Sequence, residues 1–257
     1  MYNGKRLVGL VVVRNAIELD YMPLEAAFSL LQVCDHVIIS DMESDDGTEQ
    51  MLVAAARGSE ISVVSQPWEK PFQDEHWWTK ALNYARKSFI APNEWYLQLD
   101  ADEVLGPEAK HGVAMAMSSE ICGLFRRYNF WQSPQTLVPH NRCCGEMVAR
   151  LGPAYMYLPS DEPNPLVSPN IRTSAEHFSG LTIFHYGFLR RPEAFVKKSE
   201  VVQKAFFGSV DTRIGKAQAS HARWDDYDFF DGEPLRPFED RHPALARQWL
   251  TDRGYKL

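Results

Sequence analysis

A short apolar segment, Trp95 to Leu99, is followed directly by two aspartates, Asp100 and Asp102, with one alanine between them. Residues i and i+2 of a strand point the same way, so both carboxylates would face one pocket if the extended geometry continued past Leu99. Two like charges held that close need a cation to offset their repulsion. A divalent metal with oxygen ligands, shared with substrate phosphates, is the usual solution. The alternative is a solvated acidic turn after a strand.

A second polar group, Asp41 to Thr48, follows another apolar segment, His36 to Ser40. Its later residues fit the start of a helix, with Asp46 or Thr48 as the capping side chain. A carboxylate at the very end of a strand, as Asp41 is, can accept hydrogen bonds from a base or a ribose in a nucleotide-binding type of sheet. The sequence therefore offers two candidate binding elements, each at the end of a predicted strand.

Strand and helix signals alternate along the first hundred residues, and this alternation positions both groups. The predicted strands are Leu7–Val13, His36–Ser40, Ile61–Val64 and Trp95–Leu99, and the predicted helices are 20–31, 45–57 and 76–88, the first capped by Asp20. Repeated strand-helix units predict an α/β fold with a Rossmann-like, doubly wound and mainly parallel sheet. Ligands bind beyond the carboxyl ends of the strands in such sheets, where both carboxylate groups fall.

The alternation weakens after residue 105. Further strands are predicted at 124–131, 147–151 and 181–185, and helices at 192–207 and 243–253. Five prolines between Gly152 and Asn170 predict a long loop, which in a compact domain is usually functional. No stretch of the sequence has the composition of a linker, so we predict one domain over residues 1–257.

Composition narrows the function classes. The chain has 257 residues, 45% of them hydrophobic, and a net charge of -7, which disfavours broad binding to nucleic acid or anionic lipid. The four cysteines show no metal-binding spacing and no disulfide framework, which fits a cytoplasmic location. No segment is apolar over the length of a bilayer, so any membrane association is expected to be peripheral.

The order and spacing of these motifs resemble family 2 glycosyltransferases of the GT-A fold. The resemblance rests on the segments Val11–Asn15, Ile38–Asp41 with Ser44–Thr48, Lys80–Ala85 and Leu97–Glu103. A later segment, Ile183–Glu193, is similar to bacterial and phage enzymes related to lipopolysaccharide-core glycosyltransferases. One departure is Met42-Glu43, which adds bulk and charge where the family commonly has glycine or serine.

The resemblance implies transfer of a sugar from a nucleotide-sugar, with UDP as the expected nucleotide, by a hexosyltransferase-like enzyme that uses Mn²⁺ or Mg²⁺. Residues 1–105 would be the nucleotide-sugar-binding half, and residues 106–257 the acceptor-side half with the C-terminal helices. The implied nucleotide contacts are Val13, Arg14, Asp41, Lys80 and Asp100, and the implied metal ligands are Asp100, Asp102 and His185. Lys80 could equally be a solvated helix residue, and His185 a buried core histidine.

An inverting reaction also needs a carboxylate that takes the proton from the acceptor hydroxyl. Position in the second half of the chain suggests Asp161, Glu162 or Glu146, with Asp161 preferred because it lies in the proline-rich loop. A retaining reaction needs no such base, and the sequence does not decide between the two. The expected acceptor is a glycan or lipid-linked saccharide, with a modified nucleobase as a less favoured option.

Two other functions fit parts of the sequence. Leu99 to Leu105 also fits the haloacid-dehalogenase phosphatase pattern, with Asp100 as nucleophile and Asp102 as general acid and base. That superfamily places the motif on its first strand, whereas three strand-helix units precede it here. A non-catalytic sugar-nucleotide-binding module is the other alternative, but an acidic pair in a pocket is costly without a task.

Overall fold

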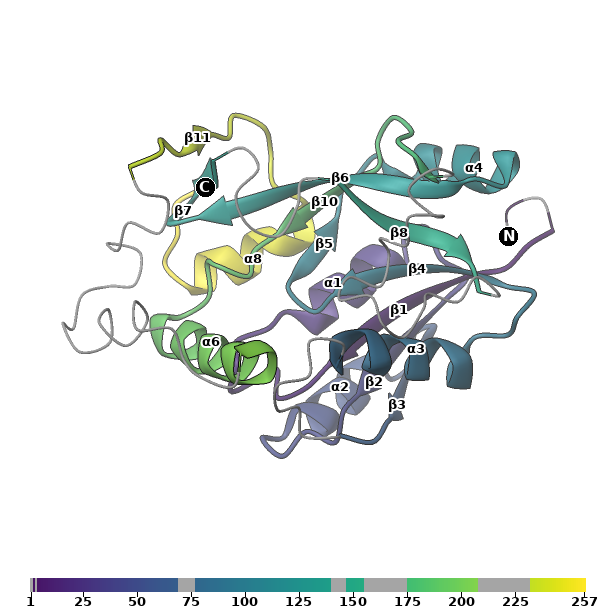
Figure 1. The fold of residues 1–257 in the computed structure, drawn as a ribbon, viewed down its shortest axis with the longest axis horizontal. Helices are drawn as coiled ribbons and strands as arrows, with labels where there is room; N and C mark the ends of the chain where they lie inside the picture. The colour runs from purple at the N-terminus through teal and green to yellow at the C-terminus, as the bar shows by residue number, and fades with distance from the viewer. Residues whose placement is uncertain (1, 3, 69–76, 140–146, 155–174, 208–231) are drawn as a thin grey trace.

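The computed structural model describes residues 2, 4–68, 77–139, 147–154, 175–207 and 232–257 (Figure 1). The strands are β1 (Leu7–Val13), β2 (His36–Asp41), β3 (Ile61–Ser65), β4 (Trp95–Asp100), β5 (Glu103–Leu105), β6 (Cys122–Trp131), β7 (Ser133–Leu137), β8 (Met147–Pro153), β9 (Ala175–Glu176), β10 (Thr182–His185) and β11 (Arg236–Pro237). The helices are α1 (Pro23–Leu30), α2 (Thr48–Ala56), α3 (Trp77–Phe89), α4 (Ala109–Ser119), α6 (Pro192–Phe207) and α8 (Ala244–Asp252).

The central sheet has a parallel part and an antiparallel part. Its order is β11-β7-β6-β8-β4-β1-β2-β3, in which β4, β1, β2 and β3 are parallel neighbours. Strand β8 pairs antiparallel with both β4 and β6, and so joins the two parts. Strand β10 lies off this path, parallel to β6 and antiparallel to β5. The antiparallel extension carries the second half of the chain to the same sheet.

Helices cover both faces of the parallel strands. Alternate residues of β1 point to opposite faces: Leu7 and Val11 pack in a core with α1, α2 and α4, whereas Val8 and Val12 pack in a core with α3. All seven residues of β1 are buried, as its continuous apolar sequence predicts for a strand covered on both faces. The predicted α/β, doubly wound and mainly parallel architecture is therefore confirmed.

The register of the parallel strands places the candidate residues at one edge. Val13 is paired with Asp41 across β1 and β2, and Val12 is paired with Asp100 across β1 and β4. Since these residues end their strands, Asp41 and Asp100 lie at the carboxyl edge of the sheet, with β1 between them. This arrangement is the one that strand-helix alternation predicts.

The start of the first helix differs from the prediction made from the sequence. It begins at Pro23, and its N-cap is Met22 rather than Asp20. Asp20 has a positive φ of 54° and instead accepts hydrogen bonds from the backbone N–H of Arg191 and from the guanidinium of Arg253. It is a buried link between the first helix and the C-terminal part of the chain, a role that capping rules do not anticipate.

Several elements have no clear sequence signal. The helix α4 contains Gly112, which weakens its helical pattern, yet a Cβ there would lie 2.7 Å from the side chain of Leu181. The glycine thus permits close packing against the segment that leads into β10. The strand β5 has only three residues and follows the Asp100–Asp102 turn directly.

Within the described residues, the helices include none that combines the length and apolar character needed to cross a bilayer.

Candidate active site

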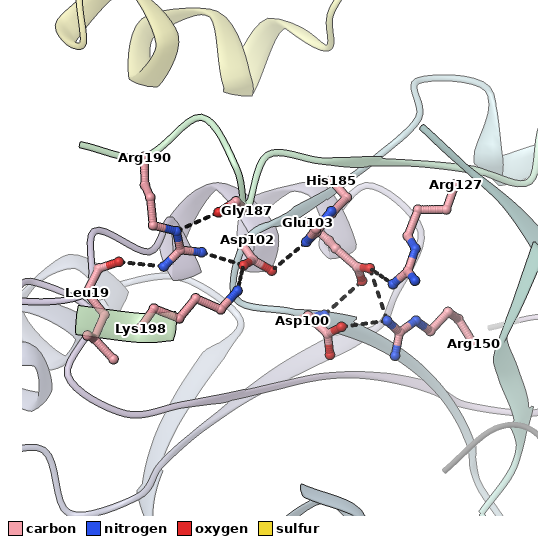
Figure 2. A network of polar contacts seen from close by, with 10 residues as sticks. All are labelled: Leu19, Asp100, Asp102, Glu103, Arg127, Arg150, His185, Gly187, Arg190 and Lys198. Carbon is pink, nitrogen blue, oxygen red and sulfur yellow. Dashed lines mark hydrogen bonds and ion pairs between the residues drawn. The ribbon is translucent and has the colours of Figure 1, made fainter. Parts of the chain in front are cut away.

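Asp102 is the centre of a buried polar cluster at the carboxyl end of β4 (Figure 2). Its Oδ2 accepts hydrogen bonds from Arg190 Nη2 at 2.6 Å and from Lys198 Nζ at 2.8 Å. Its Oδ1 lies 3.6 Å from His185 Nε2. Burial alone would raise the pKa of Asp102, but Lys198 and Arg190 hold it well below its ordinary value. Asp102 is therefore an ionised carboxylate whose partners, His185, Arg190 and Lys198, all come from the segment 185–198.

Backbone contacts fix the turn that carries Asp102. The N–H of Tyr186 donates to the carbonyl of Asp102 at 2.9 Å, and the N–H of Met22 donates to the carbonyl of Ala101 at 2.8 Å. Gly187 closes the turn from the other side, because a Cβ there would lie 2.5 Å from His185 Nε2 and 2.7 Å from Asp102 Oδ2. The sequence His185-Tyr186-Gly187 is thus fitted to the Asp102 carboxylate.

A second cluster holds Asp100. Arg150 of β8 donates to Asp100 Oδ2 at 2.7 Å and to Glu103 Oε1 at 3.0 Å, and Arg127 of β6 reaches the same Glu103 oxygen at 3.0 Å. Burial alone would lower the pKa of Arg150, but Asp100 and Glu103 raise it above its ordinary value. Glu103 is fully buried and also accepts the backbone N–H of Asp100 through Oε2 at 2.9 Å.

The two aspartates therefore turn to different partners, contrary to the expectation that both face one pocket. The strand ends at Asp100, and residues 101 and 102 form a turn, so the i, i+2 rule for strands no longer applies. Figure 2 shows Asp100 directed toward Arg150, and Asp102 directed toward Arg190 and Lys198. The predicted need for cations is met here by side chains, although Asp100 Oδ1 is buried and has no hydrogen-bond partner among the described residues.

Within the described residues, Asp102 and His185 offer a divalent ion at most two side-chain ligands. Oδ1 of Asp102 and Nε2 of His185 are 3.6 Å apart, a spacing that two ligands of one ion can take. Burial lowers the pKa of His185 to about 3, so its imidazole is neutral and able to ligate a metal near neutral pH. The described residues contain no group of three or more acidic, histidine or cysteine side chains that could hold an ion. A substrate would have to supply further ligands, as phosphates do for Mg²⁺.

Asp41 is buried and engaged with its own loop. Its Oδ2 accepts the backbone N–H of Ser44 at 2.8 Å, and its Oδ1 accepts the hydroxyl of Ser44 at 2.5 Å. Each carboxylate oxygen has a second lone pair that a ligand could use. Arg14 ties the same loop to β1, since it donates to the carbonyls of Met42 and Glu43 and lies 4.7 Å from the ring centre of Trp68.

The remaining predicted residues fall into three groups. Val13 is buried at the end of β1, next to Asp41. Lys80 is on an exposed face of α3. The three candidate bases, Asp161, Glu162 and Glu146, lie outside the described residues, as does most of the proline-rich loop.

Sequence reasoning missed the cations of the site. Arg150, Arg190 and Lys198 were not assigned to the carboxylates, because they are 50, 88 and 96 positions away from them in the chain. A usable signal was present in the segment 185–198, which places a histidine, a glycine, an arginine and a lysine at the entry to a helix. Charged side chains that follow a predicted strand edge and precede a well-marked helix are candidates for such pairing.

Comparison with known proteins identifies glycosyltransferases as similar to this chain. No protein-family model matches it. An uncharacterized glycosyltransferase of Rickettsia bellii is 26% identical over 152 residues, which cover 54% of this chain and 45% of that protein. A second one, from Rickettsia conorii, is 29% identical over 127 residues, covering 45% and 39%. The matches thus span less than half of the length of these relatives.

Among solved structures, a chain of low sequence identity has a partly similar fold. The S. aureus TarS structure in complex with UDP has 13% sequence identity and a TM-score of 0.45, and the match covers 79% of this chain and 66% of that one. Agreement at this level carries no argument about function.

Proposed function

We propose that this chain transfers a sugar from a nucleotide-sugar, with UDP as the nucleotide, to a hydroxyl group of an acceptor. The observation that carries the proposal is the placement of the Asp41 loop and the Asp102 cluster at the carboxyl edge of one parallel sheet. The similarity to curated glycosyltransferases supports it. Residues 1–105 would bind the nucleotide-sugar, and residues 106–257 would form the acceptor side, where a glycan or lipid-linked saccharide is the proposed substrate.

The chemistry assigns tasks to the two edge elements. In glycosyl transfer the bond between the anomeric carbon and the diphosphate oxygen breaks, and its electron pair leaves on the diphosphate. The acceptor oxygen forms the new bond to the anomeric carbon and loses its proton. Asp41, with Arg14 and Val13 beside it, would hold the base, and the Asp102 cluster would lie near the diphosphate. Lys80 is proposed to reach the nucleotide from the exposed face of α3.

A divalent ion would be held by Asp102 and His185, with Asp100 close by in the same turn. Mn²⁺ or Mg²⁺ would supply Lewis-acid stabilisation of the charge that builds on the departing diphosphate. In an inverting reaction, one of Asp161, Glu162 and Glu146 would accept the proton of the acceptor hydroxyl. The stereochemical outcome is left open, because a retaining reaction requires no such base.

The proposal predicts that nucleotide binding depends on a divalent ion. UDP with Mn²⁺ is expected to raise the melting temperature by roughly 5 °C at saturating concentrations, and UDP in excess EDTA by much less. The reason is that the nucleotide phosphates complete the coordination that Asp102 and His185 begin. A thermal-shift screen of nucleotide-sugars and nucleoside diphosphates, with Mn²⁺ and with EDTA, measures this. An equal shift in both conditions would remove the metal from the account, and no shift with any nucleotide would argue against the proposed function.

A further inference from the structure

Lys198 differs from the other cations of the site in its exposure. Its side chain is 24% exposed, whereas the side chains of Arg190, Arg150 and Arg127 are 1%, 5% and 7% exposed. An ammonium group carries three N–H donors, and the hydrogen bond to Asp102 Oδ2 uses one of them. Lys198 is thus the cation of this cluster that can contact both the buried carboxylate and a ligand outside it.

Arg190, by contrast, uses its guanidinium for hydrogen bonds within the protein. Its Nε donates to the carbonyl of Gly187 at 2.7 Å, its Nη1 to the carbonyl of Leu19 at 2.5 Å, and its Nη2 to Asp102 at 2.6 Å. All three nitrogens of the guanidinium therefore have partners inside the fold. Arg190 is a positioning residue that locks the turn before α6 to the segment before α1.

The charges around Asp102 do not balance within the part of the chain that the structure describes. There, Arg190 and Lys198 bring two positive charges to one carboxylate, which leaves an excess of one positive charge. In the neighbouring cluster, the described ion pairs join Arg127 and Arg150 to Asp100 and Glu103, two positive charges to two negative ones. A partly buried excess of positive charge is costly unless an anion offsets it. The uncompensated charge lies at the carboxyl end of β4, where ligands of such sheets bind.

The ring of Tyr21 fixes the position of both cations. The guanidinium carbon of Arg190 lies 4.4 Å from the centre of the ring, and Nζ of Lys198 lies 5.3 Å from it. Such contacts orient a cation without neutralising it, since the ring carries no net charge. Lys198 is therefore held in place by Asp102 and Tyr21 while its positive charge stays available to an anion.

We propose that Lys198 binds the diphosphate of the nucleotide-sugar and stabilises it as the leaving group, with Asp102 and Arg190 holding the lysine in position. This inference rests on the proposed function and adds to it a residue from the second half of the chain. It also gives α6 a task, because that helix places Lys198 beside the turn after β4 (Figure 2).

Binding of UDP and of uridine to charge-removing variants tests the proposal. Lys198→Met and Lys198→Gln are expected to weaken UDP binding about tenfold or more in calorimetry, because one hydrogen bond to a charged group is lost. Uridine binding, followed by NMR titration, should not change, since uridine lacks the diphosphate. Lys198→Arg should restore UDP binding to within a few-fold of the wild type. The Gln variant keeps a hydrogen-bond donor near Asp102. It therefore still tests the role of Lys198 if the Met variant fails to fold.

The matched control is Lys197→Met. Lys197 is the preceding residue on α6, is 55% exposed and pairs with Glu18 instead of Asp102, so UDP binding should stay at the wild-type level. UDP affinity that is unchanged in both Lys198→Met and Lys198→Gln would overturn the role of Lys198 and leave the proposed function intact. If the wild-type protein bound neither UDP nor any other nucleoside diphosphate, the proposed function and this inference would both fall.

Discussion

Asp102→Asn is expected to lower sugar transfer or donor hydrolysis by about 10³-fold, as the loss of several kcal/mol of leaving-group stabilisation implies. The amide has nearly the same size, but it cannot balance Arg190 and Lys198 or bind a divalent ion as a carboxylate does. UDP release from a UDP-sugar, measured at saturating Mn²⁺, gives the rate. A wild-type rate in a folded Asp102→Asn protein would show that this carboxylate has no role in the reaction.

In Asp102→Asn, the effect on the stability of the fold has to be distinguished from the effect on the rate of the reaction. Removing one partner of a buried ion pair typically costs about 3–5 kcal/mol, so Asp102→Asn should also unfold more easily. The double variant Asp102→Asn/Lys198→Met restores the original excess of one positive charge and should recover part of the stability without recovering the rate. Asp252→Asn is the control, since this aspartate is exposed on α8 and accepts a hydrogen bond from Gln248, one turn earlier on the same helix.

Arg150→Met is expected to lower the free energy of unfolding by about 3–5 kcal/mol. Arg150 is buried and holds both Asp100 and Glu103, so its removal leaves Asp100 without this partner and takes from Glu103 one of the two arginines that its Oε1 contacts. Urea denaturation of the wild type and the variant measures the difference. Arg126→Met is the matched control, because that arginine is exposed on the neighbouring strand and should change stability little.

The loss caused by Arg150→Met should depend on pH with a defined sign. Burial raises the pKa of Glu103 above its ordinary value even with both arginines beside it, and loss of one arginine would raise that pKa further. A carboxyl whose folded pKa lies above its unfolded pKa destabilises the protein when ionised, and this cost disappears as the pH falls through the folded pKa. The difference between wild type and variant should therefore shrink from about pH 8 to about pH 5. A difference that grew toward low pH would contradict this assignment of charges.

Local sequence patterns were sufficient for the parallel part of the fold. The segment Leu7–Val13 is continuously apolar, and the structure makes it a fully buried strand with the predicted boundaries. The helix Pro192–Phe207 likewise begins at its proline, as predicted. The carboxyl edge with Asp41 and Asp100 followed from topology alone, because parallel strands end at the same side of a sheet.

Contacts between segments that are far apart in the chain could not be predicted from local sequence patterns. The orientation of Asp102 depends on a turn that Tyr186, Gly187 and Met22 fix through the backbone, and no periodicity in the sequence encodes that turn. The expectation of a shared pocket failed because it extended the strand rule two residues beyond the strand. The assignment of Asp20 as a helix cap failed for a similar reason, since two arginines far along the chain compete for its carboxylate.

The most direct test of the central proposal is release of UDP from a panel of UDP-sugars by the purified chain, with Mn²⁺ present and a saccharide acceptor or water as the second substrate. We expect UDP release from at least one of these donors, with the rate lost in Asp102→Asn and retained in Asp252→Asn. Phosphate release from a simple phosphate ester, with no UDP release from any donor, would contradict it and favour the phosphatase alternative.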